Sequence, residues 1–405
     1  MRTLIVLALL LAGCRTAAVE DPRAPGASDR HDAVARRVLA ATPLVDGHND
    51  LPWAIRERAT QQDELALGDV ASYDLRARTP GHTDIPRLRA GMVGVQFWSV
   101  YVPADAPGAA RMQLEQMDIA RQVFERYPDV FEETLTSAAA VAAFGRGRIA
   151  SVMGIEGGHV LENSLGALRA FHALGARYLT LTHSGTTDWA DAAGDTPRHG
   201  GLNEFGREVV RELNRLGMLV DLSHVTDEAM HDALDVSAAP VIFSHSSARA
   251  VTNHERNVPD DVLRRLPRNG GIVMVTFVPM FVNDDVLAFE SLPPAQRAGK
   301  AQPRASLADV VRHLEHVRRL AGIDHVGIGG DFDGITRGPV GLEDVSTYPA
   351  LFAELSRRGW SEAELRQLAG ENALRVWREA EAVAARLQRE RGPSLMTLPS
   401  AGTRR

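Results

Sequence analysis

The 405-residue sequence contains little cysteine, few aromatic residues and no cluster of basic residues. Its single cysteine, Cys14, precedes the body of the chain, so an intrachain disulfide, a thiol nucleophile and a cysteine-based zinc site are excluded from that body. Aromatic residues make up only 5% of the chain, which argues against broad stacking platforms. Both charge signs are mixed along the chain, with a net charge of −7. Nucleic acid is therefore not expected as a partner, because phosphate binding needs a clustered basic surface.

Long apolar runs are also missing, apart from one at the N-terminus. Leu4–Leu11 follows a short basic start and leads into the small residues before Cys14. This run is too short for a permanent membrane span and is typical of an export signal. It resembles the lipobox of bacterial lipoproteins, which implies cleavage before Cys14 and lipidation of its thiol. An ordinary signal peptide with a chance cysteine is the alternative. We expect export to the periplasmic side of a bacterial membrane, with membrane contact only through the lipid.

The composition predicts one large globular domain between two flexible ends. Hydrophobic residues make up 44% of the chain and charged residues 24%, and the length is ample for a buried core. After the signal peptide at 1–13, residues 14–30 are rich in Ala, Pro, Asp and Gly and are predicted to form a flexible tether. Residues 31–387 are predicted to form the folded domain. Residues 388–405 lack an apolar period and are predicted to be a disordered tail.

Short apolar runs alternate with helical patterns through this domain, as expected for buried parallel strands joined by helices. The predicted helices are Leu165–Leu174, Asn203–Leu216, Thr226–Leu234 and Leu307–Leu320. The eight predicted strands are Leu44–Asp50, Val93–Val102, Ile149–Glu156, Tyr178–His183, Leu219–His224, Val241–His245, Ile272–Val278 and His325–Asp331. Eight strands with helical crossovers predict an α/β fold, a closed (β/α)8 barrel. An open doubly wound sheet is the alternative, but no Gly-rich dinucleotide turn follows the first strand.

Polar residues able to bind metal or move a proton lie at the carboxyl ends of six of these runs. In a parallel barrel those ends converge on the face that carries the active site. The chain has 14 histidines, so a single one means little, but four of them end predicted strands. The residues concerned are His48, Asp50, Glu156, His183, His224, His245 and Asp331.

These residue types suggest a centre with two metal ions. His48 and Asp50 lie two apart on a strand and so face the same side, where they could hold one cation. His224 and His245 could hold a second, shared through the two oxygens of Glu156. Each motif alone has another interpretation: a surface turn for His48-x-Asp50, a helix N-terminal acid for Glu156, and a hydrogen-bonded core residue for either histidine.

Three further residues are candidates for handling substrate and protons. His183 could be a metal ligand or could polarise a substrate carbonyl. Asp331 ends the last strand, where it could hydrogen-bond a metal-bound water and shuttle its proton. Asp333 precedes Gly334 and fits a turn in which Asp and Gly are favoured for backbone reasons, so Asp331 is preferred.

The sequence resembles the membrane (renal) dipeptidases from about Ala41 to about Trp377. Eight segments carry this resemblance in the family's order: VDGHNDLP at 45–52, GVQFWS at 94–99, GIEGGH at 154–159, LTLTH at 179–183, VDLSH at 220–224, SHSSA at 244–248, RNVPDD at 256–261 and GDFDG at 330–334. It implies a (β/α)8 barrel with two Zn²⁺ ions. It also implies one zinc on His48 and Asp50, the other on His224 and His245, and Glu156 as the bridge.

The resemblance further implies roles for three residues near the substrate. His183 would contact the substrate near the scissile carbonyl, Arg256 would receive its terminal carboxylate, and Asp331 would be the acid and base. Glu156, His183 and Asp331 are thus the catalytic candidates. Animal members carry disulfides and a glycolipid anchor that this chain lacks, so a homodimer stays an open possibility.

We therefore predict a zinc-dependent dipeptidase that hydrolyses dipeptides with a free C-terminal carboxylate, L,L and also L,D, by attack of a metal-bridging hydroxide. A short peptide would be its substrate. One alternative is a related metal-dependent amidohydrolase that acts on β-lactams or N-acyl amino acids. The other is a non-catalytic, lipid-anchored binding protein that kept the barrel.

Overall fold

The computed structural model describes residues 27–61 and 68–398, and at its centre lies a closed barrel of parallel strands. The barrel order is β1, β2, β4, β5, β6, β7, β8 and β9, with β9 pairing back to β1. The strands are β1 (Leu44–Asn49), β2 (Val93–Ser99), β4 (Ile149–Glu156), β5 (Ala176–Thr180), β6 (Leu219–Asp221), β7 (Ile242–Phe243), β8 (Ile272–Val275) and β9 (Val326–Ile328). The predicted eight-stranded barrel is confirmed. The predicted signal peptide, Cys14 and residues 399–405 lie outside the described residues.

A ninth strand, β3 (Phe131–Glu133), was not predicted. It pairs in parallel with the start of β4, where Phe131 lies opposite Ile149. This edge of β4 is free there because β5 begins to pair only at Met153. A three-residue strand carries no periodicity that a sequence pattern could show.

The barrel closes between its last and first strands, and a buried carboxylate joins them. Asp46 on β1 accepts hydrogen bonds from the backbone N–H of Gly330 at 2.8 Å and from the Tyr348 hydroxyl at 2.6 Å. Burial raises the pKa of Asp46, although these hydrogen bonds oppose that effect. The two ends of the domain are therefore tied by specific bonds as well as by the pairing of β1 with β9.

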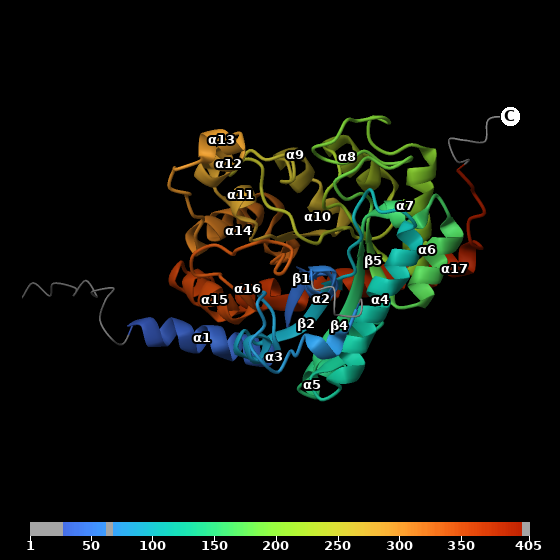
Figure 1. Ribbon diagram of the computed structural model, residues 1–405. Coiled ribbons are helices and arrows are strands. Elements are labelled where there is room, and N and C mark those ends of the chain that lie inside the picture. Colours follow the sequence, from blue (N-terminus) through green and yellow to red (C-terminus); the bar gives the residue numbers. More distant parts are fainter. Residues whose placement is uncertain (1–26, 62–67, 399–405) are drawn as a thin grey trace, which may run out of the picture.

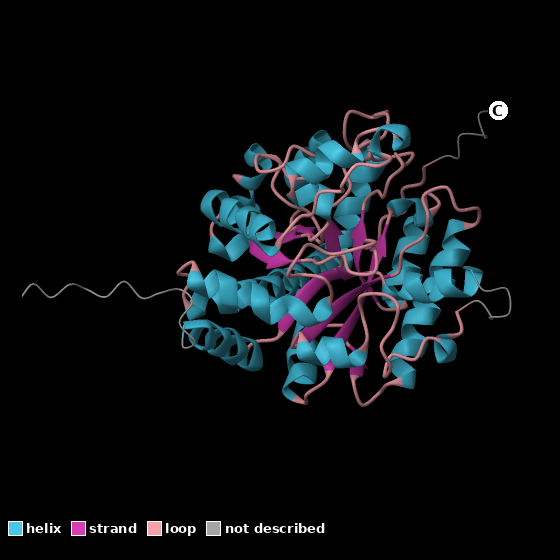
Figure 2. Ribbon diagram, turned by 60° about the vertical axis from the view of Figure 1, so that its left-hand side comes forward, coloured by secondary structure: helices cyan, strands magenta, loops and turns pink. Residues whose placement is uncertain are grey.

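Helices cover the outside of the barrel, as the cyan ribbons around the magenta strands show in Figure 2. Among the described residues, none of them is both long and apolar enough to cross a membrane. The helices are α1 (Ala27–Ala41), α2 (Leu51–Gln61), α3 (Ile85–Ala90), α4 (Ala109–Arg126), α5 (Ser137–Gly145), α6 (Leu165–Ala173), α7 (Glu204–Leu216), α8 (Asp227–Val236), α9 (Asp260–Leu263), α10 (Leu266–Asn269), α11 (Pro279–Val282), α12 (Asp284–Glu290), α13 (Pro294–Arg297), α14 (Leu307–Ala321), α15 (Tyr348–Arg357), α16 (Glu362–Arg366) and α17 (Asn372–Glu390).

The predicted helices begin and end close to the expected residues because capping signals fix them. The Asn203 side chain accepts the N–H of Gly206 at the start of α7, and Gly217 ends that helix in the left-handed conformation. Thr226 caps α8 in the same way, and Ser306 forms a capping box with Asp309 at the start of α14. These short polar residues place the helices, and hence the loops that carry the site.

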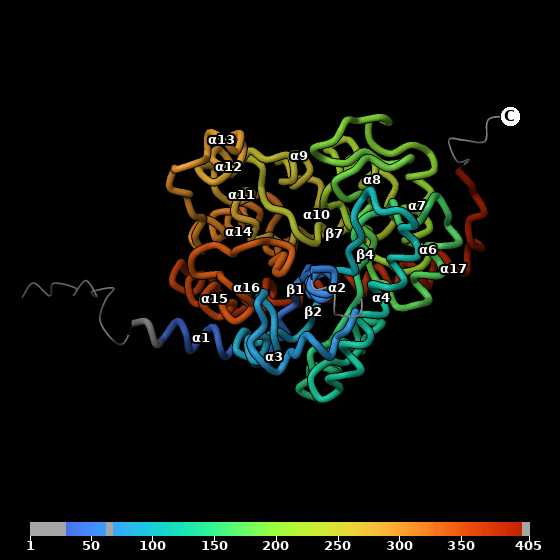
Figure 3. The backbone as a smooth tube through the Cα atoms, viewed as in Figure 1, coloured from blue at the N-terminus to red at the C-terminus, as the bar shows by residue number. Residues whose placement is uncertain are grey.

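Both ends of the predicted domain differ from expectation. Helix α1 already begins at Ala27, inside the predicted tether, and it packs along α15, so the blue helix α1 lies beside the orange-red helix α15 in Figures 1 and 3. Helix α17 continues to Glu390, and the next residues follow the barrel surface instead of being disordered. The Ser394 N–H donates to Glu212, and Thr397 forms an antiparallel bridge with Ser164. Backbone bonds to α6 and α7 thus order a segment that has no apolar period.

Candidate active site

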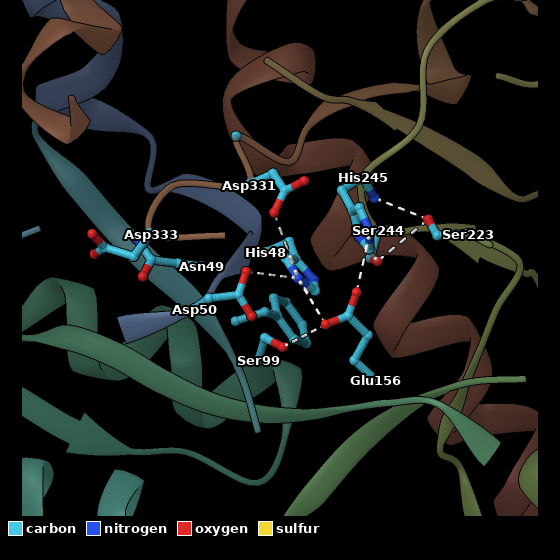
Figure 4. A network of polar contacts seen from close by, with 12 residues as sticks. His48, Asn49, Asp50, Ser99, Glu156, Ser223, Ser244, His245, Asp331 and Asp333 are labelled. Atoms are coloured by element: carbon cyan, nitrogen blue, oxygen red, sulfur yellow. Dashed lines mark hydrogen bonds and ion pairs between the residues drawn. The ribbon is translucent and has the colours of Figure 1, made fainter. Parts of the chain in front are cut away.

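A cavity of about 590 Å³ lies at the carboxyl ends of the barrel strands. All of the predicted site residues in the body of the chain line it, except His48, which is fully buried beneath it. Figure 4 shows the central group, with His48 between the carboxylates of Asp50, Glu156 and Asp331. The remaining wall is partly apolar. The lining residues are Asp50, Trp53, Glu57, Tyr101, Glu156, His183, His224, His245, Arg256, Val278, Phe281, Asp331, Asp333, Gly334, Ile335 and Thr336.

Most of these side chains come from the first residues after a strand. His48 lies within β1 and Glu156 ends β4, but His183, His224 and His245 follow their strands by two or three residues. The strands are thus shorter than predicted, and the histidines belong to the loops they lead into. Barrel closure nevertheless brings these loops together on one face.

Glu156 is the centre of the cluster, and its two carboxylate oxygens face different histidines. Its Oε2 lies 3.5 Å from His48 Nε2, which is itself 3.2 Å from Asp50 Oδ2. Its Oε1 lies 2.9 Å from His224 Nε2 and 3.4 Å from His245 Nε2. One carboxylate therefore touches both predicted ligand pairs, as a bridging ligand must.

These residues fit a metal ion. The buried Nε2 of His48 has no hydrogen-bond partner, and the Nε2 atoms of His224 and His245 lie 2.8 Å apart beside Glu156. Two imidazole nitrogens and a carboxylate oxygen at these separations can bind one divalent cation together. His48, Glu156 and His245 form one such group, and His48, Asp50 and Asp331 another. The chain thus has a metal-binding centre of His, Glu and Asp side chains.

Buried hydrogen bonds orient the histidine rings. The Nδ1 of His48 lies 2.9 Å from the Tyr178 hydroxyl, and the Nδ1 of His245 lies 2.8 Å from the Ser244 hydroxyl. Ser244 in turn donates to Asp221 at 2.6 Å. A ring held through Nδ1 presents Nε2 to a metal ion, which is the usual function of such outer contacts.

Two glycines make this packing possible. Tyr178 crosses the face of Gly154 so closely that any Cβ there would overlap the phenol ring. A Cβ on Gly334 would likewise collide with the carboxylates of Asp50 and Asp331. Larger residues at either position would displace the groups that surround the cluster.

Burial and neighbouring charges shift the pKa values of the clustered histidines. Burial lowers the pKa of His224 and of His245 well below the ordinary value, so both rings are neutral and able to bind metal at neutral pH. Burial also acts to lower the pKa of His48, but Tyr178, Asp50 and Glu156 raise it well above the usual range. Metal binding at His48 must therefore displace a proton.

The pKa values of Glu156 and Asp331 are shifted in opposite directions. Burial acts to raise the pKa of Glu156, but His48 and His183 hold it well below its usual range. Burial raises the pKa of Asp331 well above its usual range, and Asp50 and Glu156 add to this effect while His48 opposes it. A carboxylate held ionised beside one inclined to keep its proton is a common arrangement for a ligand paired with an acid or base.

The substrate-facing candidates lie around the same cavity. His183 packs edge-on against Tyr101, with ring centroids 4.8 Å apart, and its Nε2 is 3.8 Å from Glu156 Oε1. The Arg256 guanidinium lies 5.3 Å over the ring of Phe281. Asp331 Oδ1 is 4.0 Å from His48 Nε2. Hydrogen-bonding groups, a cation and a carboxylate thus surround the space next to Glu156.

The backbone is strained at two of these positions. His224 and Asp331 have φ values of 72° and 62°, in the left-handed region that glycine normally occupies. The His224 carbonyl is held by the N–H of Ala193 at 2.7 Å and by the Thr182 hydroxyl at 3.1 Å. Such conformations persist only where surrounding bonds enforce them, and they cluster at functional sites.

Some residues of the site did not stand out in the sequence. Tyr178 starts the predicted strand 178–183 and Tyr101 lies within the predicted strand 93–102, so both fit ordinary core residues. Trp53 follows the first predicted strand without a motif of its own. Asp333 has a positive φ of 66°, as a turn requires, but it is also buried, where its Oδ1 accepts the His82 N–H at 2.6 Å. Only the position of Trp53, directly after the motif at 45–52, could have drawn attention to it.

The barrel with this cluster defines a metal-dependent hydrolase. Residues 32–391 match the model of the membrane dipeptidases, peptidase family M19. The chain is 31% identical to a solved dipeptidase AC described as a metallopeptidase of family M19, with a TM-score of 0.70 over 84% of this chain and 98% of the other. It is 29% identical to a metallopeptidase from Rhodobacter sphaeroides, solved with a phosphinate mimic of the dipeptide L-Ala-D-Ala, with a TM-score of 0.70 over 84% of this chain and 99% of the other. A probable dipeptidase PvdM from Pseudomonas aeruginosa shares the fold, with 24% identity and a TM-score of 0.76 over 88% of this chain and all of the other.

The chain belongs to the membrane dipeptidase family, peptidase family M19. It is a metal-dependent dipeptidase, and the alternative of a non-catalytic binding protein is not favoured, because the expected cluster is complete.

Proposed function

We propose that the protein is a zinc-dependent dipeptidase that hydrolyses short peptides with a free C-terminal carboxylate. The observation that carries this proposal is the position of Glu156, which touches His48 through one oxygen and His224 and His245 through the other. This donor set of nitrogen and oxygen atoms suits Zn²⁺. His48 and Asp50 would hold one ion, His224 and His245 the second, and Glu156 both. When bound, the metal supplies Lewis acidity and a nucleophile at neutral pH.

Three side chains of this chain would then act on the substrate. His183 lies next to Glu156 and can donate a hydrogen bond from Nε2 to the scissile carbonyl oxygen, where negative charge develops. Asp331 can accept the proton of the attacking water and return it to the leaving amine. Its raised pKa suits a group that has to carry that proton.

Arg256 would select the free carboxylate. Its side chain lines the cavity from the loop after β7, within 3.5 Å of the His245 carbonyl oxygen. A guanidinium binds a carboxylate through two parallel hydrogen bonds, and burial strengthens that pair. A peptide that continued past this point would leave Arg256 buried and unpaired, so the substrate should end there.

A D-residue at the C-terminal position is part of the proposal. The Rhodobacter sphaeroides relative was solved with a mimic of L-Ala-D-Ala, so its site accepts that geometry. This chain is 29% identical to that relative over 84% of its length. We therefore expect both L,L and L,D dipeptides to be hydrolysed.

One experiment tests the function. Purified protein is assayed on L,L, L,D, N-acylated and β-lactam compounds, with and without a chelator, and bound metal is quantified on the same sample. Hydrolysis of the free dipeptides that disappears with the chelator and returns with Zn²⁺ is expected. Asp331→Asn should keep the metal while turnover falls by about 100-fold or more. Preference for the acylated or β-lactam compounds would instead assign the amidohydrolase alternative.

We further propose that the protein is exported and anchored at Cys14 by lipid. The support is the apolar run Leu4–Leu11 before the only cysteine of the chain. Labelling of cells with a radioactive fatty acid should mark the wild type and not Cys14→Ser. Equal labelling of both would refute the anchor.

A further inference from the structure

Glu57 is a carboxylate of the cavity wall that has no role in the chemistry described above. Glu57 lies on α2, is exposed to solvent and lines the cavity. No Lys, Arg or His side chain of the described residues lies within ion-pair distance of it. Its neighbours on the helix are engaged elsewhere: Arg56 pairs with Glu115 at 2.8 Å, and Arg58 lies over the ring of Tyr73. Glu57 therefore presents an unneutralised negative charge to the cavity.

Helix α2 arranges three lining residues in order from the metal cluster outward. Asp50 precedes the helix, Trp53 lies one turn along it, and Glu57 follows one turn later on the same face. At 1.5 Å per residue, Glu57 lies about 10 Å along the axis from Asp50. Along α2, the cavity wall thus presents first the candidate metal ligand Asp50, then the aromatic ring of Trp53, and then the carboxylate of Glu57.

An aromatic surface connects the reacting centre to this carboxylate. Trp53 packs edge-on against Tyr101 with ring centroids 4.9 Å apart, and Tyr101 packs in the same way against His183 at 4.8 Å. Arg256 and Phe281 belong to another wall, formed by the loop after β7 and by α11. If Arg256 holds the C-terminal carboxylate, the N-terminal residue of the substrate faces Trp53 and Tyr101.

We propose that Trp53, Tyr101 and Glu57 form a subsite for a long cationic side chain on the N-terminal residue of the substrate, so that dipeptides beginning with Lys or Arg are preferred. This inference rests on the proposed dipeptidase function. The apolar stem of such a side chain packs along the two rings, and its charged end reaches Glu57.

The α-amino group of the substrate does not suit this carboxylate. It is one carbon away from the scissile carbonyl and stays near the metal cluster when that carbonyl lies beside His183. Glu57 is about two helical turns farther out, so only a side chain with a stem as long as that of lysine spans the interval.

The test compares lysyl-alanine with norleucyl-alanine, which has the same apolar stem without the ammonium group. The zinc-loaded wild type should cleave the lysyl substrate with a kcat/KM about fivefold higher, as expected for one solvent-accessible ion pair. Glu57→Gln should bring the ratio close to one through a higher KM for lysyl-alanine, with the rate on norleucyl-alanine unchanged. High salt should reduce the wild-type preference in the same direction.

The matched control is Glu125→Gln on α4, which removes one exposed charge away from the cavity and should leave the ratio unchanged. A wild type without preference, or an equal ratio in wild type and Glu57→Gln, would overturn the subsite while the dipeptidase function stands. A zinc-loaded wild type that cleaves neither these two dipeptides nor those of the wider panel would instead overturn the function itself.

Discussion

The Ser244 hydroxyl should control how tightly the second metal position binds its ion. It donates to Asp221 at 2.6 Å and accepts from His245 Nδ1 at 2.8 Å, so it fixes the tautomer that leaves Nε2 free. Ser244→Ala removes the acceptor and leaves the Nδ1–H of a buried ring unpaired, which costs about 1–3 kcal/mol. Loss of such an outer contact weakens metal binding by about 10- to 100-fold, or about 1.4–2.7 kcal/mol.

Ser247→Ala is a matched control in the same loop. Ser247 is also fully buried, but its hydroxyl has no hydrogen-bond partner, so its removal should change the metal Kd by less than about twofold. Competition of each variant with a chromogenic chelator measures the Kd, and thermal unfolding with and without Zn²⁺ checks that both fold. Equal metal affinities in Ser244→Ala and Ser247→Ala would refute the reasoning that the hydroxyl orients His245.

Three other changes test separate parts of the site and the fold. Glu156→Gln should lower bound metal and turnover together, measured by elemental analysis and kinetics, and a metal-replete, fully active variant would contradict the bridge. Arg256→Ala should raise KM by about 100-fold for free dipeptides and much less for C-terminal amides, and equal effects on both would count against the carboxylate clamp. Burial lowers the pKa of His313 to about 4 from its ordinary 6.5. As the pH falls below 6.5, this histidine takes up a proton in the unfolded chain before it does so in the folded protein. The contribution of neutral His313 to the free energy of unfolding is therefore complete above pH 6.5, and up to about 3 kcal/mol of it is lost toward pH 4. Urea unfolding of wild type and His313→Asn at pH 7 and 4.5 should show a smaller loss in the variant, and identical losses would exclude His313 as a cause.

The sequence was sufficient for the barrel because its strands and helices carry strong local signals. Buried runs such as Ile149–Glu156 are typical of central strands, above all in a series of eight, and Asn203 and Gly217 mark the two ends of α7. The local sequence does not show, however, at which residue the hydrogen-bonded pairing of a strand ends. Only Ile242 and Phe243 of the predicted strand 241–245 pair as β7, because the chain turns there to form the loop that carries His245.

The candidate site residues could be predicted because they lie at strand ends. Closure of the barrel brings these ends together on one face, whatever sequence lies between them. The contacts that orient the site residues could not be predicted. Tyr178 reaches His48 across 130 residues, and only the three-dimensional packing over Gly154 shows it. The ordered segment after α17 was missed because Glu212 and Arg169 hold Ser394 by polar bonds, which leave no hydrophobic pattern.

The bond between Asp46 and Tyr348 joins residues 302 positions apart, so the ring of strands is completed only when nearly the whole domain has been synthesised. The candidate metal ligands lie on β1 and β4 and in the segments after β1, β6 and β7, so they come together only in the closed barrel. Such long-range pairing makes folding slow. A molecule that holds its metal tightly has therefore already closed its barrel. Metal retention can thus serve as a readout of complete folding.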